Sequence, residues 1–298
     1  MWCRAVVRVS NAGSIGLGRT KTSGLFYGLN CAGKIMKLLL TLTTIILILC
    51  PSREAASVRR SGAAPRPSSA LAERQKRAVD FKSPDGVTLR GTLYTPGKPG
   101  PGIILFHMCD GKGRGAWDNL AAQLAQAGFY VLTYDYRGVG ESEGERFQGG
   151  SMQQVLHYWR TKWGGDAESA LGFLLAQPGV NKKDIGAGGA SCGVYMSLLL
   201  AQQHPAQVKT LVLLGGPIDA GTKSFVENSE ELTLLGVTSE EDVRSTQWTR
   251  EIIGASKNPA TRLILYQNAG HGTQMLENVK ELRPLIVDWF TIRLRPGN

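Results

Sequence analysis

The stretch Gly189-Ala190-Ser191-Cys192-Gly193 governs the interpretation of the rest of the chain. It has the pattern G-x-S-x-G, follows the apolar run 185–190 and precedes the helical pattern 194–203. A serine at a sharp strand-to-helix turn is typical of a catalytic nucleophile, and small flanking residues relieve the crowding at such a turn. In a chain with 37 glycines the same residues also fit a simple turn after a buried strand. The remaining sequence has to separate these two interpretations.

The net positive charge of the chain belongs to its N-terminal part. Residues 1–77 carry 13 Lys and Arg against 2 acidic residues, whereas residues 78–298 carry 21 against 22, which together give the formal charge of +10. Residues 78–298 are therefore close to neutral, and their sequence contains no stretch of basic residues interleaved with aromatic ones. A nucleic-acid-binding domain would need such a basic stretch. We expect no nucleic-acid partner.

The N-terminal part has the pattern of a secretory signal peptide. Lys37 follows Met36 and precedes the thirteen-residue apolar run Leu38–Cys50. A charged start and a short apolar core are typical of such a peptide, whereas a membrane span needs roughly 20 apolar residues. On this interpretation translation starts at Met36. We expect export to the periplasm or the extracellular space.

The fate of this segment stays open between three alternatives. Cys50 could be lipidated as in a lipoprotein, cleavage could occur near Ala55 or Ala56, or the run could be retained as an anchor. An anchor of this kind is the only expected contact with a membrane. Residues 51–77 are rich in Ser, Ala, Pro and Arg and predict a flexible linker. We expect a signal or anchor segment with a disordered linker at 1–77 and one folded domain at 78–298.

Strand and helix patterns alternate through the expected domain. A hairpin opens it, and the later strands are solid apolar runs, typical of strands buried on both faces. We expect strands at 79–82, 87–94, 103–106, 130–134, 185–190, 208–214, 232–237 and 263–266, and helices at 117–125, 167–175, 194–203, 243–253 and 274–293. The pattern predicts an α/β fold: a mostly parallel, twisted sheet of about eight strands with helices on both faces. Ligands bind such sheets at the carboxyl ends of the strands.

A serine nucleophile needs a general base, and His271 is the best placed of the four histidines. It lies in Ala269-Gly270-His271-Gly272-Thr273, directly after the last expected strand. Flanking glycines would let this loop bring the imidazole close to a neighbouring turn. His157 lies in an aromatic loop, and His204 ends the helix after Ser191, where a charged imidazole can simply favour the helix terminus.

The base in turn needs an acid that fixes its tautomer and stabilises the imidazolium. The loop after the 232–237 strand offers Glu240, Glu241 and Asp242. Asp242 is the prediction, with Glu241 and then Glu240 as alternatives. A solvated run of charges is the non-functional interpretation of the same three residues.

The order Ser191, Asp242, His271 resembles the α/β-hydrolase superfamily, whose triad follows the order Ser, acid, His. The resemblance covers about 79–294, and the stretch 135–142 (DYRGVGES) looks like the family's D-x-R-G-x-G-x-S loop. Within the superfamily the chain is most similar to single-domain esterases and dienelactone-hydrolase-like proteins. True dienelactone hydrolases carry Cys at the nucleophile position, which Ser191 occupies here.

The resemblance also implies an oxyanion hole. One donor is expected to be the backbone N–H of Cys192, the residue after the nucleophile. The other is expected from the loop after the 103–106 strand, where relatives often have His-Gly and this chain has His107-Met108-Cys109. We assign it to the N–H of Cys109, with Met108 as the alternative, and expect His107 to be a structural hydrogen-bonding residue.

Two of the five cysteines, Cys109 and Cys192, lie in the expected domain. Cys192 at a helix N-terminus is a rival nucleophile, because a thiolate is activated there, although the spacing of the glycines favours Ser191. A Cys109–Cys192 disulfide in an exported protein is a further hypothesis. No Cys or His pair has metal-ligand spacing, so we expect neither a metal nor another cofactor.

The segment 143–165 is rich in Gly and aromatic residues and is the candidate cover of the site, because only about twenty residues separate the 208–214 and 232–237 strands. These roughly twenty residues leave room for no more than a minimal lid between the two strands. Tyr158, Trp159 and Trp163 could line a substrate pocket, or could be core residues.

The sequence therefore predicts a serine hydrolase, a carboxylesterase, that cleaves small-molecule esters through an acyl-enzyme intermediate. A relative that cleaves amides or peptides with the same triad is the alternative, and a catalytically inactive binding module is disfavoured because all three triad positions are filled. The natural substrate, its chain length and the oligomeric state are not predicted.

Overall fold

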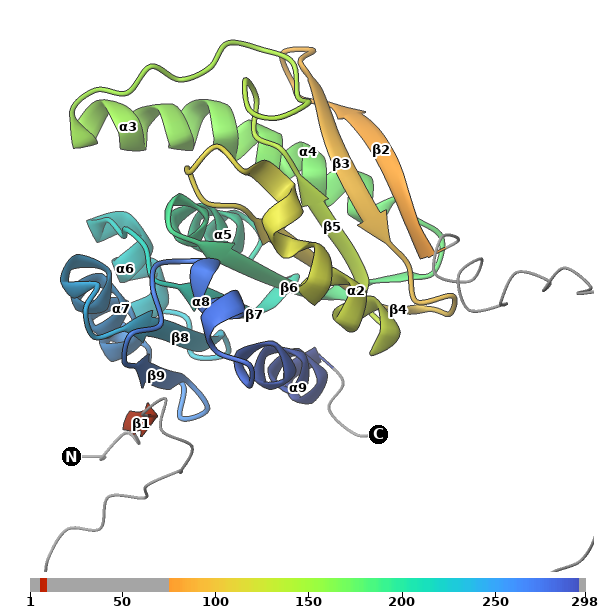
Figure 1. The fold of residues 1–298 in the computed structure, drawn as a ribbon. Helices are drawn as coiled ribbons and strands as arrows, with labels where there is room; N and C mark the ends of the chain where they lie inside the picture. Colours follow the sequence, from red (N-terminus) through yellow and green to blue (C-terminus); the bar gives the residue numbers. More distant parts are fainter. Residues whose placement is uncertain (1–5, 10–74, 295–298) are drawn as a thin grey trace, which may run out of the picture. The chain divides into compact units, whose positions relative to one another are not determined.

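The computed structural model describes residues 6–9 and 75–294. Their strands form a single sheet in the order β1-β9-β8-β7-β6-β4-β5-β3-β2 (Figure 1). The strands are β1 (Val6–Val9), β2 (Lys76–Lys82), β3 (Thr88–Tyr94), β4 (Gly100–Phe106), β5 (Tyr130–Tyr134), β6 (Val180–Ala190), β7 (Val208–Leu214), β8 (Thr233–Ser239) and β9 (Arg262–Tyr266).

The sheet is mostly parallel. β2 pairs with β3 and β3 with β5 in the antiparallel sense, and every other neighbouring pair is parallel. The predicted sheet of about eight strands with an antiparallel hairpin at one edge is confirmed, and β1 adds a ninth strand of four residues beside β9. β2 begins at Lys76, two residues before the expected start of the domain.

Helices cover both faces of the sheet, as predicted. They are α2 (Asp118–Gln126), α3 (Met152–Tyr158), α4 (Gly164–Leu175), α5 (Cys192–Gln203), α6 (Ala220–Glu227), α7 (Val243–Ala255), α8 (Gln274–Asn278) and α9 (Leu282–Leu294), with the short 3-10 helix η1 (Gly113–Trp117) and the short π-helix η2 (Trp159–Trp163). Buried residues of α4, α5, α6 and α7 belong to one apolar cluster, and those of α2, α8 and α9 to another.

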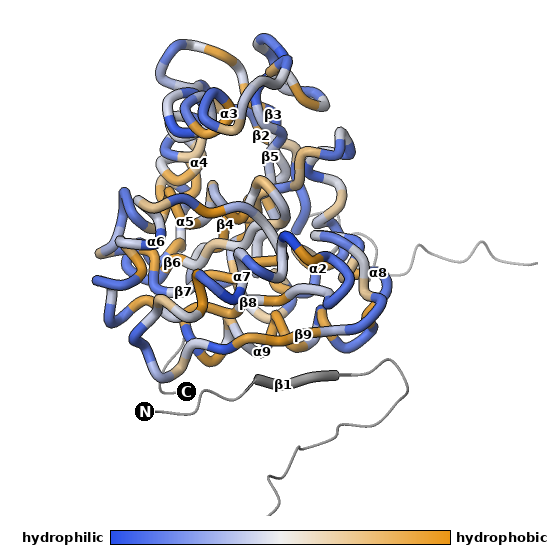
Figure 2. The backbone as a smooth tube through the Cα atoms, turned by 90° about the vertical axis from the view of Figure 1, so that its left-hand side faces the viewer, coloured by the Kyte–Doolittle hydropathy of each residue, from blue (hydrophilic) through white to orange (hydrophobic). Residues whose placement is uncertain are grey.

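The alternation of side chains along each strand fills these two clusters. In β4, Ile104 and Phe106 belong to the first cluster, whereas Ile103 and Leu105 belong to the second. Successive side chains of a strand point to opposite faces, so a sheet covered on both sides needs solid apolar runs. Figure 2 shows the hydrophobic positions of the chain running through the interior and the hydrophilic ones on the outer helices and loops.

Several boundaries differ from the sequence prediction. The expected helix 274–293 is two helices, because Val279 has extended backbone angles between α8 and α9. Helix α6 was not predicted, although Asp219 and Thr222 form a capping box at its start. The expected aromatic loop contains α3, which Ser151 and Gln154 cap in the same way.

The predicted signal peptide 36–50, lipidation at Cys50, cleavage near Ala55 and most of the linker lie outside the described residues. Among the helices that the structure describes, none combines the length and hydrophobicity required to cross a membrane.

Candidate active site

Ser191 occupies the turn between β6 and α5. Its φ of 53° and ψ of −121° lie in a region that residues with a side chain rarely adopt. Backbone hydrogen bonds hold it there: the Ser191 N–H donates to the carbonyl of Leu214 at 3.2 Å, and the Val194 N–H donates to the carbonyl of Ser191 at 2.9 Å. A strained residue that its surroundings fix firmly is typical of a functional site.

The two glycines of the motif allow a close backbone approach at this turn. A Cβ atom on Gly189 would lie 1.9 Å from the carbonyl oxygen of Gly193, and a Cβ atom on Gly193 would lie 2.2 Å from the carbonyl oxygen of Phe106. Any larger residue would push α5 away from β4 and β6. The glycines therefore set the position of the helix that begins directly after Ser191.

Asp242 and His271 are in direct contact. Asp242 follows β8 as the N-cap residue of α7, and its Oδ2 atom lies 2.5 Å from Nδ1 of His271. The Oγ atom of Ser245, in the first turn of α7, lies 3.4 Å from the same Nδ1. Because Nδ1 is engaged by the carboxylate, Nε2 is the nitrogen of His271 that is left for a reacting group.

The environment of Asp242 keeps this carboxylate ionised. Partial burial alone would raise its pKa, but hydrogen bonds from His271 and Ser245 outweigh burial and hold the pKa below the usual value. The two alternative acids are engaged elsewhere. Glu241 accepts the backbone N–H of Asn268 at 2.8 Å, and Glu240 accepts a hydrogen bond from Gln267 at 3.1 Å.

The loop that carries His271 packs against the residue before the proposed nucleophile. Gly272, with a φ of 57°, approaches so closely that a Cβ atom there would lie 3.5 Å from Cβ of Ala190. The backbone N–H of His271 donates to Oε1 of Gln274, in the first turn of α8, at 3.0 Å. The structure thus places the three predicted triad residues on adjoining loops, with Asp242 and His271 joined directly.

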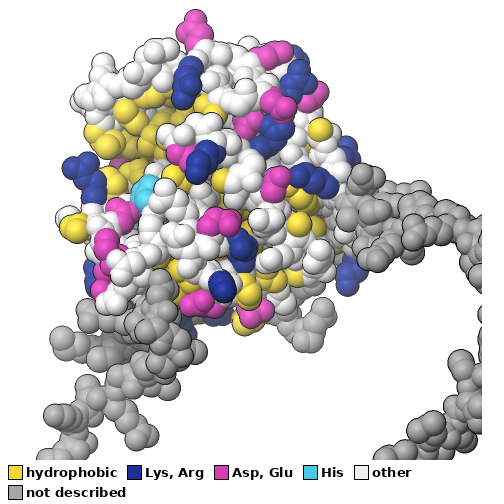
Figure 3. Space-filling model, in the orientation of Figure 1, with side chains coloured by type: hydrophobic (Ala, Val, Ile, Leu, Met, Phe, Trp, Pro, Cys, Tyr) yellow, Lys and Arg dark blue, Asp and Glu magenta, His cyan; other side chains and the backbone are white. Residues whose placement is uncertain are grey.

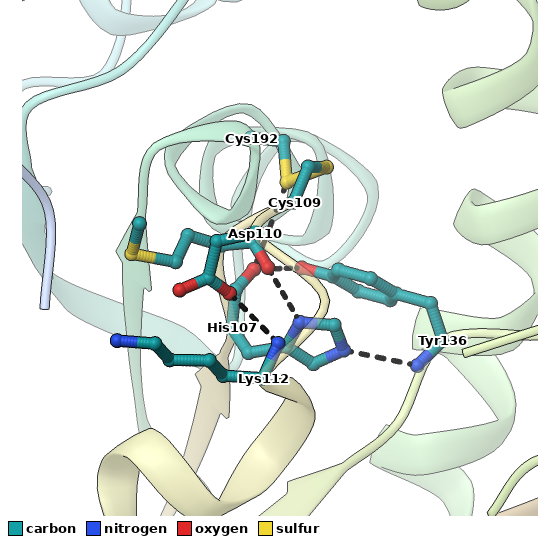
Figure 4. Close-up of a disulfide and its surroundings, with 7 residues drawn as sticks. His107, Cys109, Asp110, Lys112, Tyr136 and Cys192 are labelled. Carbon is teal, nitrogen blue, oxygen red and sulfur yellow. Dashed lines mark hydrogen bonds between the residues drawn. A yellow bond between two sulfur atoms is a disulfide. The ribbon is translucent and has the colours of Figure 1, made fainter. Parts of the chain in front are cut away.

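Cys109 and Cys192 form a disulfide, and their Cα atoms lie 6.0 Å apart (Figure 4). The disulfide hypothesis is confirmed, and the alternative of Cys192 as nucleophile is wrong for this state, because a bonded sulfur is not a thiolate. The Sγ atom of Cys192 lies 3.7 Å from the carbonyl oxygen of His107. This is a packing contact, because a disulfide sulfur has no proton to donate.

His107 is buried and fixes the loop after β4. Its Nδ1 donates to the carbonyl of Met108 at 2.8 Å, and its Nε2 accepts the backbone N–H of Tyr136 at 3.2 Å (Figure 4). These partners require the neutral tautomer with the proton on Nδ1. Burial lowers the pKa of His107 and favours that neutral form. His107 therefore has the structural hydrogen-bonding geometry that was expected of it.

Met108 shows why a side chain occupies this position in place of glycine. It is buried, and its Sδ atom accepts a hydrogen bond from Oγ1 of Thr273 at 3.0 Å. The same sulfur would lie 3.0 Å from a Cβ atom on Gly272. Met108 therefore connects the predicted oxyanion loop to the loop that carries His271.

The three candidate pocket residues differ in burial. Trp159 and Trp163 are buried in the first apolar cluster and stack on each other with an interplanar angle of 8°. Of the two interpretations left open by the sequence, these two residues fit that of core residues. Tyr158 is half-buried and stacks on Phe147 with ring centroids 4.5 Å apart. Figure 3 shows hydrophobic side chains gathered in a hollow on a face that also exposes a histidine.

Three residues at the site were not predicted: Tyr136, Ser245 and Thr273. Tyr136 was visible in the D-x-R-G motif, but its hydrogen bonds to His107 depend on tertiary structure. Ser245 and Thr273 carried no sequence signal beyond their positions near Asp242 and His271. Within residues 6–9 and 75–294, no group of three or more His, Cys, Asp or Glu side chains could hold a metal ion.

The model of the family described as "Serine aminopeptidase, S33" matches residues 103–240. A thiohydrolase from Arthrinium phaeospermum is 31% identical over 134 residues, which are 45% of this chain and 41% of that protein. A polyketide transferase from Stachybotrys chlorohalonatus is 28% identical over 131 residues, which are 44% of this chain and 41% of that protein. The chain thus spans about two fifths of the length of these relatives.

Solved structures share the fold over nearly their whole length. A dienelactone hydrolase from Anabaena variabilis matches with a TM-score of 0.60 and 20% identity, covering 74% of this chain and 99% of that one. An esterase from Pyrococcus furiosus matches with a TM-score of 0.59 and 15% identity, covering 79% of this chain and 97% of that one.

Proposed function

We propose that the chain is an α/β-hydrolase, and specifically a serine hydrolase that cleaves carboxylic esters through an acyl-enzyme intermediate. The observation that carries the proposal is the contact between Nδ1 of His271 and Asp242, on a loop whose Gly272 approaches Ala190, the residue before the strained Ser191. An imidazole whose Nδ1–H donates to a carboxylate presents a basic Nε2, which is the requirement for activating a serine.

In the proposed reaction Nε2 of His271 takes the proton of Ser191 as Oγ attacks the ester carbonyl. The negative charge that develops on the carbonyl oxygen is stabilised by the backbone N–H groups of Cys109 and Cys192. His271 then gives its proton to the departing alcohol, which leaves the acyl group on Ser191. A water molecule, activated by His271 in the same way, attacks the acyl-enzyme and releases the acid.

We propose an apolar acyl or alcohol group for the substrate. The hollow in Figure 3 is lined by hydrophobic side chains, and Tyr158, one of the predicted pocket residues, is half-buried. Two alternatives have specific support: the matching family model is described as that of a serine aminopeptidase, and one relative is named a thiohydrolase. Amides and thioesters are therefore the substrates to test beside esters.

The test is hydrolysis of a panel of p-nitrophenyl esters, acyl thioesters and aminoacyl p-nitroanilides by the full chain. We expect turnover of the esters, and we expect Ser191→Ala to lower kcat by about 10⁴-fold or more. Ser224→Ala, on the exposed face of α6, is the matched control and should behave like the wild type. Turnover that survives Ser191→Ala, or turnover of the anilides alone, would contradict the proposal.

We also propose that the protein is exported, through the signal-peptide pattern at 36–50. The Cys109–Cys192 disulfide supports an oxidising compartment, because cytosolic thiols are kept reduced. The proposal is tested by expressing the chain with and without residues 36–50 in a bacterial host and fractionating the cells. Equal amounts in the cytoplasmic fraction for both forms would contradict export.

A further inference from the structure

The disulfide joins the two backbone segments that are expected to supply the oxyanion hole. We propose that the Cys109–Cys192 disulfide is a positioning element that holds these two N–H donors together, so that reducing it slows catalysis. This inference rests on the proposed hydrolase function. It assigns a role in the reaction to a covalent bond that lies outside the triad.

The two backbone N–H groups are available for a ligand. Across residues 75–294, no hydrogen bond of the structure is donated by the backbone N–H of Cys109 or Cys192. Cys192 is the first residue of α5, where helical N–H groups have no partner within the helix and carry a partial positive charge. Two donors that share one oxygen have to lie close together, and the disulfide keeps these two residues close, with Cα atoms 6.0 Å apart.

A hydrogen bond also orients the peptide that carries the Cys109 donor. The Met108 carbonyl and the Cys109 N–H belong to one trans peptide, so they point in opposite directions. Because the carbonyl accepts from the His107 ring at 2.8 Å, the Cys109 N–H points away from that ring. His107 thus sets the direction of the donor, and the disulfide sets its distance from Cys192.

Cys109 is the first exposed residue after the buried pair His107 and Met108. Residues 109–112 are exposed, and Gly111 follows Cys109 by two residues, where the lack of a side chain restricts the backbone less than other residues would. Cys192, in contrast, is buried at the start of a helix packed against the sheet. The disulfide therefore ties the exposed start of this loop segment to a rigid element, and Cys109 is on the side from which a reductant would approach.

Reduction would leave both donors chemically intact. A dithiol such as dithiothreitol supplies two electrons and two protons by thiol–disulfide exchange, forms its own cyclic disulfide and leaves two protein thiols. The N–H groups of Cys109 and Cys192 persist, so a loss of rate in protein that stays folded comes from their relative position. Because the oxyanion forms only after attack on the carbonyl, we expect the loss in kcat and little change in KM.

The experiment compares four forms of the full chain on a p-nitrophenyl ester: oxidised wild type, reduced wild type after removal of the reductant without air, Cys109→Ala, and Cys109→Ala/Cys192→Ala. We expect kcat of the last three forms to be about 10- to 100-fold below the oxidised wild type, with KM within about 3-fold. Reoxidation should restore the wild type. The double variant keeps Cys3, Cys31 and Cys50, so its kcat should not respond to reductant.

A second readout separates positioning from simple loss of structure. A trifluoromethyl ketone, which forms a tetrahedral adduct, should bind the reduced protein more weakly by a factor similar to the loss in kcat. A substrate-like amide that binds without reacting should bind both forms equally. Unchanged kcat after reduction, or a loss in proportion to the unfolded fraction measured by circular dichroism, would overturn the inference. No turnover by the oxidised wild type would instead refute the hydrolase function, and the oxyanion hole with it.

Discussion

Nδ1 of His271 lies 2.5 Å from Oδ2 of Asp242, and this contact joins two loops that are 29 residues apart in the chain. Asp242 is positioned by its second role as the N-cap of α7, where its Oδ1 atom accepts the Ser245 N–H at 3.4 Å. The carboxylate is therefore fixed by the helix before it meets the imidazole. Such a carboxylate orients the ring and selects its tautomer.

Replacing Asp242 by Asn should lower kcat by about 10⁴-fold with little change in KM, because the amide would favour the wrong tautomer of His271. The measurement is steady-state ester hydrolysis. Glu241→Gln is the matched control, since Glu241 accepts the Asn268 N–H rather than contacting the ring. Equal losses in both variants would mean that Asp242 is not the acid.

The sequence was sufficient to predict the sheet because strands covered on both faces must be continuous apolar runs. β4 and β7 are recognisable on that ground alone. α6 has only eight residues, and two of them are buried, so its apolar pattern is weak. The break between α8 and α9 did have a signal: Pro284 lies in the first turn of α9, where its missing N–H costs nothing.

The candidate triad could be proposed from chain order, because the family motif places each residue after a particular strand. The oxyanion loop could not be described in the same way. The partners of His107 are a neighbouring peptide and Tyr136, which are adjacent to it only in the folded sheet. Likewise, two cysteines 83 residues apart do not reveal from spacing alone whether they pair.

Replacing His107 should slow catalysis through the peptide that it orients. His107→Leu removes the donor to the Met108 carbonyl, and we expect kcat to fall by about 10-fold or more. His107→Asn keeps a side-chain donor near the position of Nδ1 and should recover part of that loss. The measurement is kcat and KM for the same ester. Equal kcat in the two variants would contradict the role of the hydrogen bond to Met108.

Replacing Gly193 by Ala should destabilise the fold by about 3 kcal/mol or more, because the new Cβ atom would lie 2.2 Å from the Phe106 carbonyl oxygen, and backbone cannot yield easily. Gly254→Ala is the matched control in α7, where a Cβ atom meets nothing within 4 Å. It should stabilise the protein by about 0.5–1 kcal/mol. Urea unfolding followed by circular dichroism measures both changes, and similar values for the two variants would contradict the argument.

The ion pair between Asp85 and Arg137 should make stability depend on pH in the acid range. Arg137 binds the carboxylate with two hydrogen bonds of 2.8 and 2.9 Å, and these hold the pKa of Asp85 well below its ordinary value of 3.8. A carboxyl group whose pKa is lowered by folding contributes stability that is complete above the pKa of the unfolded state. That stability is lost as pH falls toward the pKa of the folded state.

Asp85→Asn should therefore lower the free energy of unfolding at pH 7, and its difference from the wild type should shrink as pH falls below 3.8. Asp288→Asn, on the exposed side of α9, controls for the change in net charge. Urea unfolding from pH 7 to 2.5 checks the result, and a difference between Asp85→Asn and wild type that stays constant over this range would show that the ion pair does not contribute.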